Sequence, residues 1–232
     1  MVMSRASAPG AASPPQRAAT GRRRVQPLAA ARMVVFVLVS LPAAALLWGL
    51  FTGGLGVNPV ETITKQTGIW TLRLVVATLA VTPLRWATGW NGAIRLRRML
   101  GLFAFFYGTL HFSTYLVLDQ FFALDLIVED VKERPFITAG FTAFVLMIPL
   151  ALTSTAGMIR RLGGRAWNRL HRLVYVTAVC GVLHYAWLAK VEIPAPFVYG
   201  AIVAGLLGIR VWRWSQRSRV VSARSMTPVT DQ

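Results

Sequence analysis

The chain has 232 residues, of which 55% are hydrophobic and only 14% are charged. A soluble domain carries about 25% charged residues, so this composition excludes an ordinary soluble protein. The net charge of +17 would suit a nucleic-acid partner, but the basic residues border apolar segments instead of covering a polar domain. We therefore expect membrane lipid, and no nucleic acid, around this protein.

Residues 1–32 are rich in Ala, Pro, Ser and Arg and predict a disordered cytoplasmic tail. Six apolar segments follow, each near the roughly 20 residues that a helix needs to cross a membrane. They cover residues 33–51, 69–84, 99–118, 136–153, 173–189 and 197–211. Since none alternates as a strand would, the predicted fold is all-α, an integral membrane six-helix bundle over 33–214. A short cytoplasmic tail, 215–232, completes the chain.

Charge predicts the orientation of these helices. If six helices alternate in direction, 20 of the 25 Lys and Arg residues lie on one side of the membrane and seven of the eight acidic residues on the other. The positive-inside rule then places both termini in the cytoplasm. The outer connection 119–135 carries Asp119, Asp125, Glu129, Asp130 and Glu133. This connection is a candidate docking surface for a partner, or a loop that merely follows the charge rule.

Two of the three histidines are predicted at the same depth. His111 lies 13 residues after Arg98, and His184 lies 12 residues after Arg172, roughly 19 and 18 Å along helices that run in the same direction. Both imidazoles then lie in the outer half of the membrane, where they can ligate one haem iron from opposite faces. The alternatives are neutral histidines that hydrogen-bond across helices, or a zinc or copper site.

The third histidine, His171, lies at the cytoplasmic start of the fifth segment. It can hold a second haem with a non-histidine partner, contact a propionate, a flavin or a quinone, or be an ordinary interfacial histidine. Nearby arginines can hold the same groups or simply mark the cytoplasmic side: Arg97, Arg98, Arg169 and Arg172. The single Cys180 excludes a disulfide framework and a cysteine-held cluster, and it is expected as a small packing residue rather than a ligand.

A set of motifs between residues 68 and 212 resembles a known family. They are TPLR (82–85), RRMLGLFAFFYGTLHF (97–112), KERPFITAG (132–140), LALTSTAGMIRRLGGRAWNRLHRLVY (150–175) and LHYAW (183–187). In this order they resemble the haem-binding membrane subunits of the bacterial protein-methionine-sulfoxide reductase system, the MsrQ family, also known as YedZ. That family is similar to the ferric-reductase-like transmembrane group.

The resemblance implies a multi-pass protein of the bacterial inner membrane that carries haem b and FMN and transfers electrons without substrate chemistry of its own. The family's haem-region histidines fall on His111, His171 and His184. The implied electron donor is the quinone pool or a cytoplasmic flavin reductase. The implied acceptor is MsrP, a periplasmic molybdopterin enzyme that repairs oxidised methionines. Alternative functions are a ferric or cupric reductase membrane subunit and, in another class, a proton-linked metal carrier.

Overall fold

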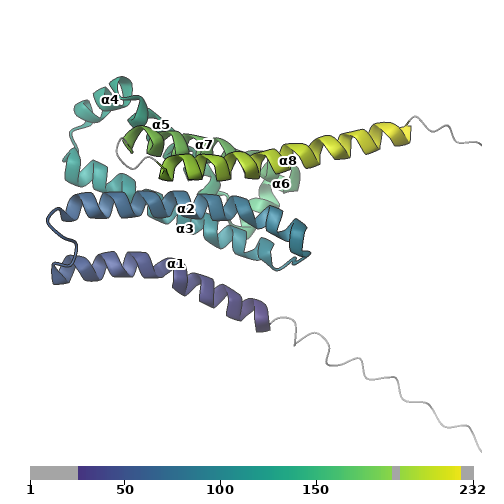
Figure 1. Cartoon of the computed structure of the whole chain (residues 1–232), viewed down its shortest axis with the longest axis horizontal. Helices are drawn as coiled ribbons and strands as arrows, with labels where there is room; N and C mark the ends of the chain where they lie inside the picture. Colours follow the sequence, from purple (N-terminus) through teal and green to yellow (C-terminus); the bar gives the residue numbers. More distant parts are fainter. Residues whose placement is uncertain (1–25, 190–193, 226–232) are drawn as a thin grey trace, which may run out of the picture.

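The computed structural model of the protein describes residues 26–189 and 194–225, and this part of the chain is helical without strands. Six helices build an elongated bundle: α1 (Gln26–Thr52), α2 (Pro59–Thr88), α3 (Ala93–Thr114), α5 (Pro135–Leu152), α7 (Leu173–Leu188) and α8 (Ala195–Ser225). Short elements connect them: the π-helical turn η1 (Tyr115–Asp119) and the helices α4 (Leu124–Glu133) and α6 (Ala156–Leu170). Helix α4 lies at one end of the bundle, and the first and last described residues lie at the other (Figure 1).

Five helices in the described part of the chain are long and apolar enough to cross a membrane. They are Leu28–Thr52, Pro59–Thr88, Ala93–Asp119, Pro135–Leu152 and Ala195–Gln216. Helix α7 is apolar but has only 16 residues, about 24 Å at 1.5 Å per residue, against a hydrocarbon core of about 30 Å. The predicted all-α membrane fold is confirmed for the described residues, whereas six spans and two cytoplasmic termini stay predictions.

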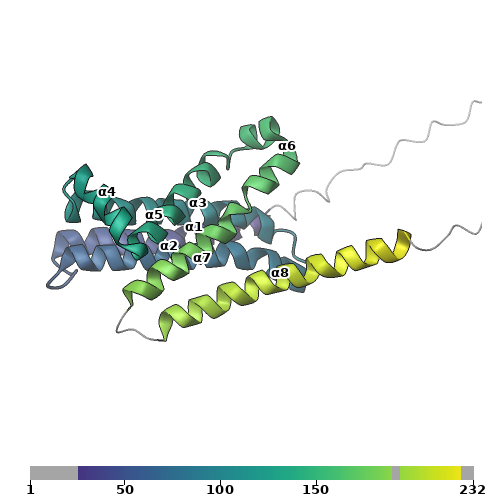
Figure 2. The same cartoon turned by 90° about the horizontal axis from the view of Figure 1, so that it is seen from above.

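The structure differs from the predicted segments mainly at their ends. Helix α1 begins at Gln26, before the predicted start at 33, and α8 continues to Ser225, past the predicted end at 214. Residues 1–25 and 226–232 of the two predicted tails lie outside the described residues. Helices α4 and α6 fall in segments expected only as connections, because each has one polar face and neither is an apolar run. Figure 2 shows α6 projecting to one side of the bundle.

Local sequence signals set the limits of α2, which supports one wall of the site. The Asn58 side chain accepts a hydrogen bond from the backbone N–H of Glu61 at 3.2 Å, and Pro59 occupies the first turn, where a missing N–H costs nothing. At the other end Gly89 adopts φ 68° and its N–H donates to the Arg85 carbonyl. The resulting turn lets α3 run back antiparallel against α2, while α5 and α7 form a second packed pair.

Helix α1 is joined to this core through Tyr107 of α3. The Tyr107 side chain is fully buried, and its hydroxyl donates to the Val39 carbonyl at 2.7 Å and accepts from the Ala43 N–H at 3.0 Å. These are two backbone groups that a regular helix would pair with each other, and they flank Pro42. The hydroxyl therefore inserts into the ladder of α1 where proline already disturbs it, and α1 bends along its length (Figure 1).

A second proline explains the position of α8. Pro83 lies inside α2 and has no N–H, so the Leu79 carbonyl loses its helical donor. Arg210 of α8 supplies the replacement, because its Nη2 donates to that carbonyl while Nη1 donates to the Leu206 carbonyl. The guanidinium also lies 5.6 Å from the ring centre of Tyr175 on α7. One arginine thus joins α8 to α2 and α7 within the bundle.

We expect Arg210→Met to destabilise the bundle by about 1–3 kcal/mol, because a buried carbonyl is left without a donor. In a Pro83→Ala background, where the substituted residue restores the helical N–H, the loss of the arginine should cost less. Thermal unfolding of the four proteins in detergent measures this coupling. Arg213→Met, which removes a cation against the Trp86 ring at 4.6 Å, is the control and should show no coupling to position 83. Equal costs of Arg210→Met in both backgrounds would contradict this explanation.

Candidate functional site

The structure brings two of the three histidines together inside the bundle. His111 near the end of α3 and His184 near the end of α7 face each other, with ring centres 6.0 Å apart and ring planes at 76°. Both rings are partly buried. Helix rise predicted that the two histidines lie at the same depth, and the structure adds that their rings also lie side by side across the bundle.

Each imidazole is oriented by a backbone carbonyl of a neighbouring helix. Nδ1 of His111 lies 2.9 Å from the Thr64 carbonyl of α2, and Nδ1 of His184 lies 2.7 Å from the Phe136 carbonyl of α5. A carbonyl only accepts, so each Nδ1 carries the hydrogen and donates. The lone pair of each neutral ring is then on Nε2, which is the arrangement found in metal-ligating histidines with a fixed outer partner.

The separation of the rings fits a metal held between them. Two metal–nitrogen bonds of about 2 Å each, together with about 1 Å from each nitrogen to its ring centre, require ring centres about 6 Å apart. An edge-to-face aromatic pair also has centres about 4.5–7 Å apart, so the distance alone does not distinguish the two. The fixed Nδ1 donors and the space around the rings favour the metal.

That space is a cavity of about 1200 Å³ lined by residues of α2, α3, α5, α7 and α8, including both histidines. Cofactor pockets commonly occupy about 300–1000 Å³, so a large planar cofactor fits here. Much of the wall is apolar, for example Leu72, Val75 and Phe144. Its outer rim carries two ion pairs, Lys65–Glu61 at 2.7 Å and Arg134–Asp130 at 3.1 Å. The arrangement suits a non-covalent group that the two histidines approach from different helices and that rests against an apolar wall.

Packing around the end of α3 fixes His111. The Thr114 hydroxyl donates to the His111 carbonyl at 2.7 Å, and the hydroxyls of Thr64 and Thr114 lie 3.1 Å apart, which joins α2 to α3. On the other side the Phe112 ring stacks on Phe144 of α5 with centres 4.7 Å apart. Helix α3 is therefore held on both sides at the residue that carries the imidazole.

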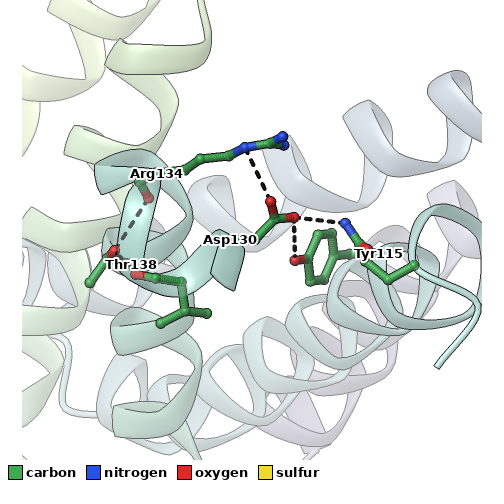
Figure 3. A network of polar contacts seen from close by, with 6 residues as sticks. Tyr115, Asp130, Arg134 and Thr138 are labelled. Atoms are coloured by element: carbon green, nitrogen blue, oxygen red, sulfur yellow. Dashed lines mark hydrogen bonds and ion pairs between the residues drawn. The ribbon is translucent and has the colours of Figure 1, made fainter. Parts of the chain in front are cut away.

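A polar network centred on Asp130 lines the cavity at its α4 end (Figure 3). Its carboxylate accepts from the Tyr115 hydroxyl at 2.9 Å and from the Gln120 amide at 2.7 Å, and pairs with Nε of Arg134. Asp130 is only 8% exposed. It was predicted in an outer connection that is either a docking surface or a loop following the charge rule. The structure buries Asp130, whereas Asp119, Asp125, Glu129 and Glu133 are exposed.

Unusual backbone geometry brings this network together. The π-helical turn η1 follows the end of α3 and places Tyr115 toward α4. Phe121 and Phe122 then have φ values of 46° and 60°, a left-handed conformation that bulky residues rarely adopt. Such strain persists only where surrounding contacts impose it, and π-turns are frequent beside functional sites. The sequence carries no local signal for this turn, so Tyr115 and Gln120 were not among the predicted site residues.

His171 lies outside the cavity lined by the other two histidines. It follows α6, where its ring stacks on Trp167 with centres 3.7 Å apart and its Nδ1 lies 3.1 Å from the Trp167 carbonyl. The Trp167 indole N–H in turn donates to the Thr153 carbonyl at 2.9 Å. Burial, followed by the positive charge of Arg97, lowers the pKa of His171 below its ordinary 6.5. Arg97 of α3 is therefore close enough to His171 for its charge to act on the imidazole.

Cys180 is a free thiol on α7, partly buried and outside the residues that line the cavity. It lies one turn before His184 without sharing its pocket. Its role as a small packing residue stays a prediction.

Comparison with known proteins defines the class first. Residues 67–182 match the family described as ferric reductase like transmembrane component, a stretch that includes His111 and His171 and ends two residues before His184. Together with the helical bundle, this places the protein among ferric-reductase-like membrane proteins.

More similar relatives identify the family within this class. The chain is 53% identical over 191 residues to the protein-methionine-sulfoxide reductase heme-binding subunit MsrQ of Herminiimonas arsenicoxydans, covering 81% of this chain and 88% of the relative. It is 51% identical over 207 residues to MsrQ of Ralstonia nicotianae, covering 88% and 95%. MsrQ of Azospira oryzae is 51% identical over 194 residues, covering 83% and 82%. The chain belongs to the MsrQ family, as its motifs predicted.

Loss of the Asp130 carboxylate should loosen the attachment of α4 beside the cavity. Asp130→Ala leaves the Tyr115 hydroxyl and the Gln120 amide without their acceptor, and we expect a local cost of about 1–3 kcal/mol. Hydrogen exchange of α4 in detergent should then be roughly tenfold faster or more. Asp125→Ala, in the exposed first turn of the same helix, should leave that exchange unchanged. Unaltered exchange in Asp130→Ala would show that the network does not hold α4.

The environment of His171 predicts a pH dependence of stability. Because its pKa is lowered in the folded state, the unfolded chain takes up the proton first as the pH falls through 6.5, and stability is lost on acidification. Between about pH 7.5 and 5.5 the melting temperature of the wild type should fall more than that of His171→Gln. Equal falls in the two proteins would contradict the assigned environment.

Proposed function

We propose that this protein is a six-span b-type cytochrome of the bacterial inner membrane, and that His111 and His184 are the axial ligands of one haem. The observation that carries the proposal is the pair of facing imidazoles, each with Nδ1 donating to a helix carbonyl and Nε2 left for a metal. The MsrQ relatives, described as heme-binding subunits, support the choice of haem.

The residues around the pair determine what such a site does. Haem iron held by two imidazoles exchanges single electrons and has no open position for substrate. The chain's own part is to hold both rings at fixed orientation through Thr64 and Phe136, to keep water from the apolar wall, and to bind the group without a covalent link. The chain therefore acts as an electron carrier within a larger oxidoreductase complex.

Electrons enter on the arginine-rich side of the bundle, which we assign to the cytoplasm from the charge distribution. Arg97, Arg98, Arg169 and Arg172 lie in the segments around His171 and supply positive charge for a flavin phosphate or a quinone. The resemblance to the MsrQ family supports FMN as a second cofactor, and the quinone pool or a cytoplasmic flavin reductase as the donor.

Electrons leave at the opposite end, next to α4. The acceptor we propose is MsrP, the periplasmic molybdopterin enzyme of the methionine-sulfoxide reductase system. The names of the relatives support a partner from that system and do not name MsrP itself. Exposed acids on the outer connection, Asp119, Asp125, Glu129 and Glu133, supply a charged docking surface. The class alternative, a ferric reductase subunit, would differ in its acceptor and not in its paired histidines.

A spectrum of the purified protein tests the proposal. Protein expressed with haem supplied should show a Soret band and a sharp α-band on reduction by dithionite. His111→Ala and His184→Ala should each lose at least about tenfold in bound haem, while His171→Ala should keep the bis-histidine spectrum of the cavity. Colourless wild-type protein would overturn the cytochrome assignment in favour of a metal carrier. A bis-histidine spectrum that survives in either cavity variant would refute the ligand pair.

A further inference from the structure

The two imidazoles are held by the same local motif in two different helices. The carbonyl that accepts from His111 belongs to Thr64 of α2, and four residues later α2 has Gly68. The carbonyl that accepts from His184 belongs to Phe136 of α5, and four residues later α5 has Gly140. Each histidine therefore meets a carbonyl followed by glycine at the i+4 position.

Helix geometry explains why glycine is needed at this spacing. A helical carbonyl points along the axis toward residue i+4, whose N–H takes one of its two lone pairs. The side chain of residue i+4 leans back toward the N-terminus of the helix and covers the same carbonyl from outside. With glycine at i+4 the second lone pair is accessible to a ring from another helix.

The space measured around the two glycines agrees with this explanation. A Cβ added at Gly140 would lie 2.7 Å from Nδ1 and 2.9 Å from Cε1 of His184, and one added at Gly68 would lie 3.0 Å from Cε1 and 3.1 Å from Nδ1 of His111. Real Cβ atoms essentially never approach closer than 3.0 Å. The atoms in conflict belong to the imidazoles themselves, so any added methyl displaces the ring that we assign to the metal.

We propose that Gly68 and Gly140 are positioning residues for the two axial imidazoles, each exposing a helix carbonyl on which the ring docks its Nδ1–H. The inference rests on the haem site proposed above and adds the residues that set the orientation and basicity of its ligands. The two carbonyl–imidazole contacts are not equivalent. The Thr64 carbonyl also receives a 3.1 Å contact from the Thr67 hydroxyl, whereas the Phe136 carbonyl makes the shorter imidazole bond and has the tighter glycine.

The experiment compares Gly140→Ala and Gly68→Ala in the full-length protein loaded with haem. Loss of an outer hydrogen bond to a metal ligand typically costs about 10–100-fold in affinity. We expect haem affinity to fall by that factor in Gly140→Ala and by less in Gly68→Ala. A weaker Nδ1 hydrogen bond also makes the imidazole less basic and stabilises ferric iron less, so the midpoint potential of the retained haem should become more positive.

Two other helical glycines are matched controls. Cβ atoms added at Gly101 of α3 and Gly200 of α8 would meet only Thr78 Cγ2 at 3.9 Å and Val182 Cγ1 at 3.6 Å, which are ordinary contacts. Gly101→Ala and Gly200→Ala should keep the wild-type haem affinity and midpoint potential. Alanine is the better helix former in both controls, so haem-free Gly101→Ala and Gly200→Ala should not melt below the haem-free wild type.

Specific results would overturn the inference. Wild-type haem affinity and potential in both Gly68→Ala and Gly140→Ala would remove any positioning role. Haem loss in Gly101→Ala or Gly200→Ala as large as that in Gly140→Ala would show a general effect of alanine on helix packing instead. If Gly140→Ala does not accumulate, Gly68→Ala decides. A wild-type protein that binds no haem would refute the proposed function itself, whereas coloured wild type with unaffected variants would refute only the role of the glycines.

Discussion

Hydrogen bonding to backbone carbonyls between helices is the constraint on which this structure depends. A group that a helix leaves unpaired inside a membrane finds no water and must be satisfied by another part of the protein. Tyr107 satisfies this need in the ladder of α1, and Arg210 satisfies it at the carbonyl freed by Pro83. His111 and His184 use the same kind of contact on α2 and α5. The contacts that hold the helices together and those that hold the site are of one type.

This shared origin makes the candidate site rigid. Each imidazole is fixed at its Cα by its own helix and at its Nδ1 by the neighbouring one, so the ring has little freedom to turn. Thr114 and Phe112 restrain α3 on both sides of His111. A carrier that changes its charge by one electron benefits from ligands that do not move, because less of the surrounding protein has to reorganise. Packing between α2, α3, α5 and α7 therefore contributes directly to the proposed activity.

Prediction from the sequence succeeded where a regular helix determines the result. Helix rise predicted the equal depth of His111 and His184, because height depends only on counting residues from a charged boundary. The carbonyl partners could not be predicted, because every residue has a backbone carbonyl and the sequence does not show which of them face the histidines. The burial of Asp130 was not predicted from the sequence. It depends on a π-turn and on two phenylalanines with left-handed backbone conformation, which no local pattern indicates. Helices α4 and α6 were not predicted, because they are amphipathic and the prediction rested on wholly apolar segments.

The shortness of α7 has a consequence for the membrane around the protein. This helix is about 24 Å long, whereas α2, with 30 residues, extends about 45 Å. A bilayer adapts to a short helix by thinning locally, at a modest cost for each ångström of mismatch. His184 lies only four residues before the end of α7. In the proposed six-span topology, such thinning beside α7 would bring headgroups and water closer to His184 than to His111, whose helix is longer.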